Sequence, residues 1–134
     1  MTMENKIMSY GISKIVSLSF EQAIEKITEE LKKEGFGVLT TIDMKETLKK
    51  KIDVDIPRYT ILGACNPNFA NKTLQIEKEI GLFLPCNVLV YEQNGSITVS
   101  AFDPLVMDTI VTNPALQPLS EEVRQKLQRV IAAM

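Results

Sequence analysis

The sequence contains no histidine and no tryptophan, and it has only two cysteines among its 134 residues. Without imidazole the chain can form no Ser-His-Asp or Cys-His catalytic pair, no His-ligated zinc or haem site and no histidine proton shuttle. Catalysis would have to use carboxylates, lysine, tyrosine or a thiol. The composition therefore leaves open whether the protein is an enzyme.

A strong excess of charge of either sign is also lacking. The chain has 15 Lys and Arg against 17 Asp and Glu, which gives a formal net charge of -2. Because phosphate contacts need a basic surface, we expect no nucleic-acid partner. Acidic residues such as Asp53 and Glu77 follow no oxygen-loop pattern, so we expect no metal site, and no pattern indicates a cofactor.

Long apolar runs are missing as well. The most apolar stretch, 80–91, is too short to cross a bilayer and is interrupted by Pro85 and Asn87. Residues 1–8 carry Glu4 and Lys6 and do not have the pattern of a signal peptide. We therefore expect a cytoplasmic protein with no membrane partner, in which the two cysteines are reduced thiols by default.

What is present is typical of one globular domain. Hydrophobic residues make up 45% of the chain and charged residues 24%. These are ordinary proportions for a soluble fold, and the length suffices to bury a core without disulfides or metal. We expect an N-terminal extension over 1–9 followed by a single domain over 10–134.

Hydrophobic periodicity and capping signals predict alternating strands and helices. The expected strands are 11–18, 36–42, 58–65, 87–91 and 97–102, and the expected helices begin at Ser19, Asp43, Asn66, Pro104 and Ser120. Asn94-Gly95 predicts a tight antiparallel hairpin between the last two strands. Met44 and Leu48 are expected to face the core. The prediction is an α+β fold with a mixed or mostly antiparallel sheet of about five strands and helices packed against it.

Two short phrases are the most informative part of the chain. Residues 63–67 read GACNP and residues 81–88 read GLFLPCNV, so a Cys-Asn pair stands at a predicted element boundary in each. Together with YTILGACNP, IGLFLPCNVLVYE and the later FDP, they make 10–134 resemble a family of small prokaryotic proteins catalogued as domain of unknown function 302. The resemblance implies a compact α/β domain that forms homodimers and has no established activity. It makes Cys65, Cys86 and Asp103 candidates for a shared site.

The two cysteines allow different interpretations. Cys65 is predicted at the end of a strand just before a helix, where the helix dipole would favour a thiolate. It could equally be a small residue that simply packs in the interior. Cys86 enters the next predicted strand, so the two thiols either form a reversible disulfide or lie separately.

Asn66 and Asp103 each precede a proline and are suited to capping a helix. If both helix N-termini faced one cleft, their amides together with Arg58 would bind a small anion such as a carboxylate or phosphate. The candidate ligand-binding residues are Arg58, Cys65, Asn66, Cys86, Asn87 and Asp103.

Three functions follow as alternatives. The first is a homodimeric binding module for a small molecule, expected to be an anion. The second is a thiol-based redox or carrier protein that uses Cys65 and Cys86. The third is a regulatory or interaction protein without a ligand site. The apolar segment 82–84 is expected to be either a subunit contact or the wall of an apolar pocket.

Overall fold

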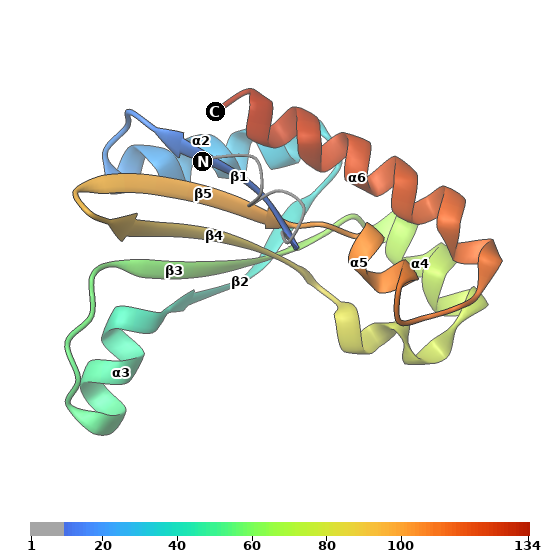
Figure 1. The fold of residues 1–134 in the computed structure, drawn as a ribbon, viewed down its shortest axis with the longest axis horizontal. Helices are drawn as coiled ribbons and strands as arrows, with labels where there is room; N and C mark the ends of the chain where they lie inside the picture. Colours follow the sequence, from blue (N-terminus) through green and yellow to red (C-terminus); the bar gives the residue numbers. More distant parts are fainter. Residues whose placement is uncertain (1–9) are drawn as a thin grey trace.

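A five-stranded sheet forms the centre of the computed structural model, which describes residues 10–134 (Figure 1). The extension expected over 1–9 lies outside the described residues. The strands are β1 (Gly11–Val16), β2 (Gly37–Asp43), β3 (Tyr59–Cys65), β4 (Cys86–Gln93) and β5 (Ser96–Phe102). The helices are α2 (Phe20–Lys33), α3 (Met44–Ile52), α4 (Pro67–Ile76), α5 (Leu105–Asp108) and α6 (Gln117–Ala132), with 3-10 turns η1 (Lys78–Phe83) and η2 (Pro114–Leu116). The α+β prediction is confirmed.

The strand order is β1-β5-β4-β3-β2, and every neighbouring pair is antiparallel. The hairpin between β4 and β5 turns at Asn94 and Gly95, whose φ angles of 52° and 79° match the turn that the Asn-Gly pair predicts. Between β3 and β4, α4 and η1 lie beyond the end of the sheet instead of crossing it (Figure 1). The chain therefore returns antiparallel, and the mixed sheet allowed by the sequence does not form within residues 10–134.

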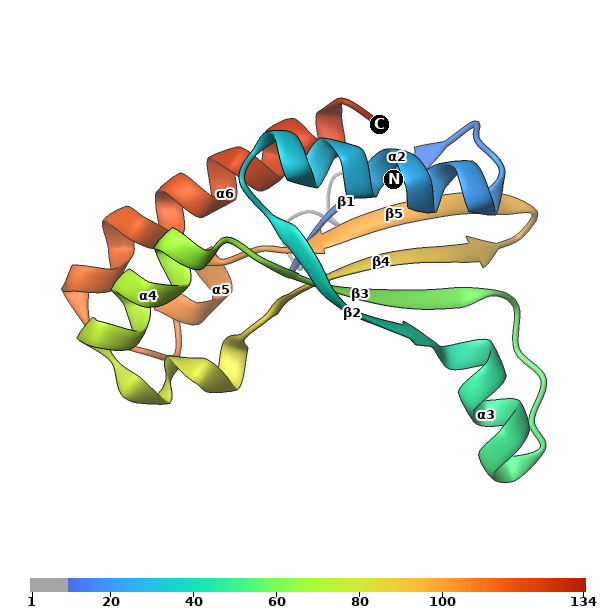
Figure 2. The same cartoon turned by 180° about the vertical axis from the view of Figure 1, so that it is seen from behind.

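Helices α2 and α6 cover one face of the sheet (Figure 2). Ser19 caps α2 with the expected capping box, because its hydroxyl accepts from the Gln22 backbone N–H and the Gln22 side chain accepts from the Ser19 N–H, both at 3.1 Å. The apolar stripe of α2 is buried against the inner side chains of the sheet and the facing side of α6. This core includes Ala23, Ile27, Leu31, Val88, Val90, Val99, Leu127 and Val130.

A smaller apolar cluster joins the short elements at one end of the sheet. Ile80 of η1, Met107 of α5 and Leu116 of η2 are buried together. Helix α6 begins at Gln117, and not at Ser120 as expected from the sequence, because Pro118 occupies its first turn. Ser120 is instead buried inside the helix, where its hydroxyl donates to the Asp108 carboxylate at 3.1 Å and ties α6 to α5.

The opposite face of the sheet has no helix over it in either view of residues 10–134 (Figures 1 and 2). Helix α3 extends away from the ends of β2 and β3 and has no buried residue. The expectation that Met44 and Leu48 face the core is therefore wrong, since α3 has no second layer to pack against. None of the helices described is long and apolar enough to cross a membrane.

Candidate functional site

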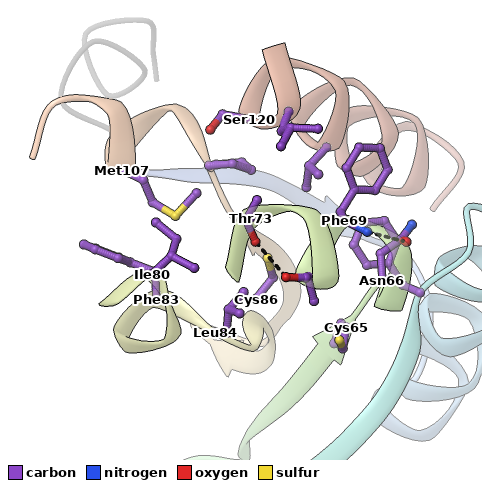
Figure 3. Close-up of a pocket in the computed structure, with 16 residues that line it drawn as sticks. Cys65, Asn66, Phe69, Thr73, Ile80, Phe83, Leu84, Cys86, Met107 and Ser120 are labelled. Carbon is purple, nitrogen blue, oxygen red and sulfur yellow. Dashed lines mark hydrogen bonds between the residues drawn. The ribbon is translucent and has the colours of Figure 1, made fainter. Parts of the chain in front are cut away.

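A narrow cavity of about 40 Å³ lies beyond the ends of β3 and β4, between α4, η1, α5 and α6 (Figure 3). Its lining is mostly apolar, with contributions from Phe69, Ile80, Phe83, Leu84, Met107 and Val123. Cys65, Asn66 and Cys86 also line it. The two Cys-Asn phrases therefore reach one neighbourhood, although they are far apart in the sequence.

Asn66 connects the cavity to the main core. Its side-chain oxygen accepts a long hydrogen bond from the Phe69 N–H at 3.5 Å, as a cap of α4, and its amide group donates to the Glu34 carbonyl at 3.3 Å. Glycine is required nearby, because Gly35 has φ +86° and a Cβ there would lie 3.0 Å from the Asn66 amide nitrogen. Asn66 therefore caps α4, and its hydrogen bond to Glu34 connects the start of α4 to the end of α2.

Cys65 and Cys86 are both free thiols. Cys86 is paired with Ala64 across the β3–β4 ladder, so both lie on the helix-covered face of the sheet. Cys65 follows Ala64 in β3 and therefore lies on the opposite face. The two side chains are well separated in Figure 3. Burial raises the pKa of the Cys86 thiol to about 11, and Cys65 adds a smaller electrostatic contribution in the same direction.

The polar side chains of the cavity wall already have partners. The Thr73 hydroxyl donates to the Ala70 carbonyl at 3.1 Å, and Ser120 donates to Asp108. Across residues 10–134, every fully buried side-chain nitrogen or oxygen has a hydrogen-bond partner. The cavity therefore presents carbon and sulfur surface to a ligand.

The starts of α4 and α5 do converge on the cavity, because Asn66 and Pro104 both line it. One backbone N–H at each start already has a side-chain acceptor, however, namely Asn66 for α4 and Asp103 for α5. The Asp103 carboxylate accepts from the Leu105 N–H at 3.0 Å and from Arg124 Nε, which lies 3.1 Å from each of its oxygens. Asp103 thus caps α5 and holds α6 through Arg124.

Three of the six candidate residues do not line this cavity, namely Asp103, Arg58 and Asn87. Arg58 precedes β3 at the end opposite Cys65, where it pairs with Glu21 at 2.7 Å and lies 4.0 Å above the centre of the Phe20 ring. A strand of seven residues separates the two ends by roughly 20 Å. Asn87 is exposed. It pairs with Gly63 across the β3–β4 ladder and lies on the face of the sheet without helices.

Other lining residues have no signal in the sequence that distinguishes them from ordinary core residues. Phe69, Ile80 and Met107 are apolar residues of helical segments, which are usually core residues. Ser120 is expected from the sequence to begin the last helix. The segment 82–84 did carry a signal, since a pocket wall was one of its two interpretations. Phe83 and Leu84 line the cavity, whereas Leu82 is 80% exposed. No group of three or more Cys, Asp or Glu that could hold a metal ion occurs within 10–134.

Comparison with known proteins gives a family and a fold. The family model described as domain of unknown function DUF302 matches residues 12–134. The crystal structure of an uncharacterized conserved DUF302 protein from Bacillus stearothermophilus is similar, with 30% sequence identity and a TM-score of 0.87. The match covers 92% of this chain and 96% of that one. No curated protein matches the sequence. The chain therefore belongs to the DUF302 family.

Proposed function

We propose that this protein is a cytoplasmic, homodimeric binding module whose ligand places an apolar group in the cavity between α4, η1, α5 and α6. The observation that carries the proposal is the lining of this cavity, where apolar side chains from several separate elements surround two thiols. Ligand sites combine such apolar walls with few polar groups. The two Cys-Asn phrases contribute Cys65, Asn66 and Cys86 to the same wall.

The volume limits what the cavity accepts in this conformation. At about 40 Å³ it is far below the roughly 300 Å³ at which drug-sized sites begin. A group of a few heavy atoms fits, and any larger ligand, benzene and hexanoate included, enters only when one wall moves. The wall best suited to move is η1 with α5, because both are short and are joined through the small cluster of Ile80, Met107 and Leu116.

An anionic ligand, as the sequence suggests, has less support than an apolar one. Its binding would need free amides or an unpaired cation. Asn66 and Asp103 already accept from the helix amides, and Arg58 lies at the far end of β3. A carboxylate attached to an apolar chain remains compatible with the proposal, with its charge outside the cavity mouth.

A thiol-based function is the second candidate, because both cysteines line the same cavity. Two features weigh against it. The raised pKa of Cys86 keeps that thiol protonated at neutral pH, and the thiolate is the reactive form. Cys65 and Cys86 occupy alternate positions on their strands, so a disulfide would require the end of the sheet to rearrange.

The proposal is tested by NMR on protein labelled with ¹³C at the methionine methyl groups. Met107 lines the cavity and is identified by comparison with Met107→Leu. Three probes are titrated: benzene, hexanoate and inorganic phosphate. We expect benzene and hexanoate to shift the Met107 resonance in a saturable way, while phosphate leaves it unchanged. A saturable response to phosphate alone would replace this proposal with the anion site, and no response to any probe would refute both.

Matched variants locate the binding. Ala70 lines the cavity, so Ala70→Leu should fill it and weaken benzene binding by at least 10-fold. Ala132 is exposed in the last turn of α6, and Ala132→Leu makes the same change at the end of this helix that does not line the cavity. Equal benzene affinity in the two variants would show that the probe binds elsewhere and would contradict the proposal.

A further inference from the structure

Cys65 and Cys86 both line the cavity, but they reach it from different sides. Cys86 pairs with Ala64 and lies on the helix-covered face of the sheet, whereas Cys65 is the last residue of β3 and lies on the opposite face. Neither thiol has a hydrogen-bond partner within residues 10–134. The wall of the cavity therefore carries two free thiols in positions that are not equivalent.

The objections to a thiol-based function concern Cys86 and the pair, and they do not apply to Cys65 by itself. Desolvation raises the pKa of Cys86 to about 11, which keeps that thiol protonated at neutral pH. Both residues are half-buried, so exposure does not separate them. Position does, because Cys65 directly precedes Asn66, the N-cap of the ten-residue helix α4, where the helix dipole favours a negative charge.

The lack of histidine narrows the chemistry that Cys65 can perform. Cysteine proteases depend on an imidazole as general base and acid, and this chain has none. Thiol–disulfide exchange has no such requirement, because the attacking thiolate displaces another thiolate. Exchange with an external disulfide also leaves Cys86 unchanged, so the separation of the two thiols is no obstacle to it.

We propose that Cys65 forms a reversible mixed disulfide with a low-molecular-weight disulfide that carries a short apolar arm, and that this arm occupies the cavity. The Cys65 thiol loses its proton to solvent, and its thiolate attacks the sulfur that bears the arm. A bond forms between Cys65 Sγ and that sulfur, and the original sulfur–sulfur bond breaks. The other half of the disulfide leaves as a thiolate and takes up a proton from solvent, so the step needs no further oxidant. This inference rests on the proposed function, because it assigns a ligand class to the same cavity.

The size of the cavity explains why a covalent bond would be needed. A space of about 40 Å³ accepts a group of a few heavy atoms. Burial of each CH₂ group is worth about 4-fold in an equilibrium constant, so an arm of about three carbons gains only about 60-fold by itself. A bond to Cys65 holds the arm beside the cavity, where Phe69, Phe83 and Val123 supply the apolar contacts.

Alkyl thiosulfonates test this inference on the whole chain, because each transfers its S-alkyl group to a thiol and releases methanesulfinate. The reagents are methyl, propyl and sulfonatoethyl methanethiosulfonate, and the last of these carries a negative charge on an arm of similar length. Peptide mass spectrometry after acid quenching gives the rate at each cysteine. The preference of Cys65 for the propyl over the sulfonatoethyl reagent should exceed that of an exposed reference thiol by at least about 10-fold. Cys86 should remain unmodified.

Two variants provide the reference and locate the arm. Ala132→Cys in a Cys65→Ser background supplies the reference thiol, since Ala132 is exposed at the end of α6 that does not line the cavity. Ala70→Leu fills the cavity and should reduce the preference of Cys65 for the propyl reagent to that of the reference. The methyl reagent, which has no arm to bury, should react with Cys65 in this variant as it does in the wild type.

The adduct gives a second readout. The propyl adduct should shift the Met107 methyl resonance more than the methyl adduct does, and dithiothreitol should restore the starting spectrum. Equal preference at Cys65 and at the reference thiol would overturn the inference, as would modification of Cys86 before Cys65. The benzene titration of Cys65→Ser reports on the cavity without this thiol. A saturable benzene response together with an unselective Cys65 would therefore contradict the mixed disulfide and leave the proposed function standing.

Discussion

Replacing Asp103 by alanine should destabilise the fold without changing the ligand cavity. The Asp103 side chain is 15% exposed and accepts hydrogen bonds from the Leu105 N–H and from Arg124. Loss of the helix cap costs about 1 kcal/mol. Leaving the Arg124 side chain, which is 32% exposed, without its partner costs about 1–3 kcal/mol more. The expected loss of unfolding free energy is therefore about 2–4 kcal/mol.

Urea denaturation and thermal unfolding measure this loss. In a domain of this size about 4 °C of melting temperature corresponds to 1 kcal/mol, so Asp103→Ala should lower the Tm by about 8–16 °C. Asp103→Asn keeps the acceptor for Leu105 and should lose less. A double-mutant cycle with Arg124→Met isolates the contact between the two side chains, and we expect a coupling of about 1–2 kcal/mol.

Two results would refute the structural role of Asp103. One is a loss below about 0.5 kcal/mol for Asp103→Ala, which is within the range of an ordinary surface change. The other is unchanged stability accompanied by loss of the Met107 response to benzene. The second result would place Asp103 in ligand binding, as the sequence allowed.

Two further predictions concern groups that titrate. In Cys65→Ser, iodoacetamide should react with Cys86 slowly at pH 7.5, with a midpoint near pH 11, because burial raises the pKa of that thiol. The contribution of the Cys86 thiol to the free energy of unfolding is complete below its unfolded pKa of about 8.5 and is lost as the pH rises toward 11. Cys86→Ala should therefore lose less stability than the wild type between these two pH values. A reaction midpoint at or below pH 8.5 would contradict both the slow reaction and this pH dependence. The hydrogen bond from Arg129 lowers the pKa of Glu34, so this stabilisation is present above about pH 4.3 and disappears as the pH falls through the lowered value. Glu34→Gln should therefore lower the free energy of unfolding, measured by urea denaturation, more at pH 7 than at pH 2, and an equal loss at both pH values would show that the ion pair is not responsible.

Local signals in the sequence predicted most of the elements of the fold. Ser19 with Gln22, and Asn94 with Gly95, act through hydrogen bonds and backbone angles within a few residues, so the sequence contains all the information they need. Strand order is different, because it depends on where the connecting helices pack. The parallel pairing that the sequence allowed fails because α4 and η1 lie beyond the sheet end instead of crossing its face.

The same division applies to the candidate site. The Cys-Asn phrases predicted a shared neighbourhood, and Cys65, Asn66 and Cys86 do line one cavity. Arg58 does not reach them, because it precedes β3 while Cys65 and the start of α4 lie at the other end of this strand, a separation that the predicted strand 58–65 already implies. Met107 and Ser120 could not be singled out, since their place on the wall depends on how α5 and α6 pack against each other.

The stacking of Tyr59 on Tyr91 could not be predicted from the sequence. Tyr59 and Tyr91 each stand in an alternating strand, and such residues usually pack with a wet hydroxyl. Only the register, which sets Tyr59 opposite Tyr91, brings the rings together, and only the position of both helices on one side leaves them uncovered. Which side of a strand becomes covered is decided by the packing of segments far away in the sequence, so the alternating pattern alone could not show that these two rings lie together on the side of the sheet without helices.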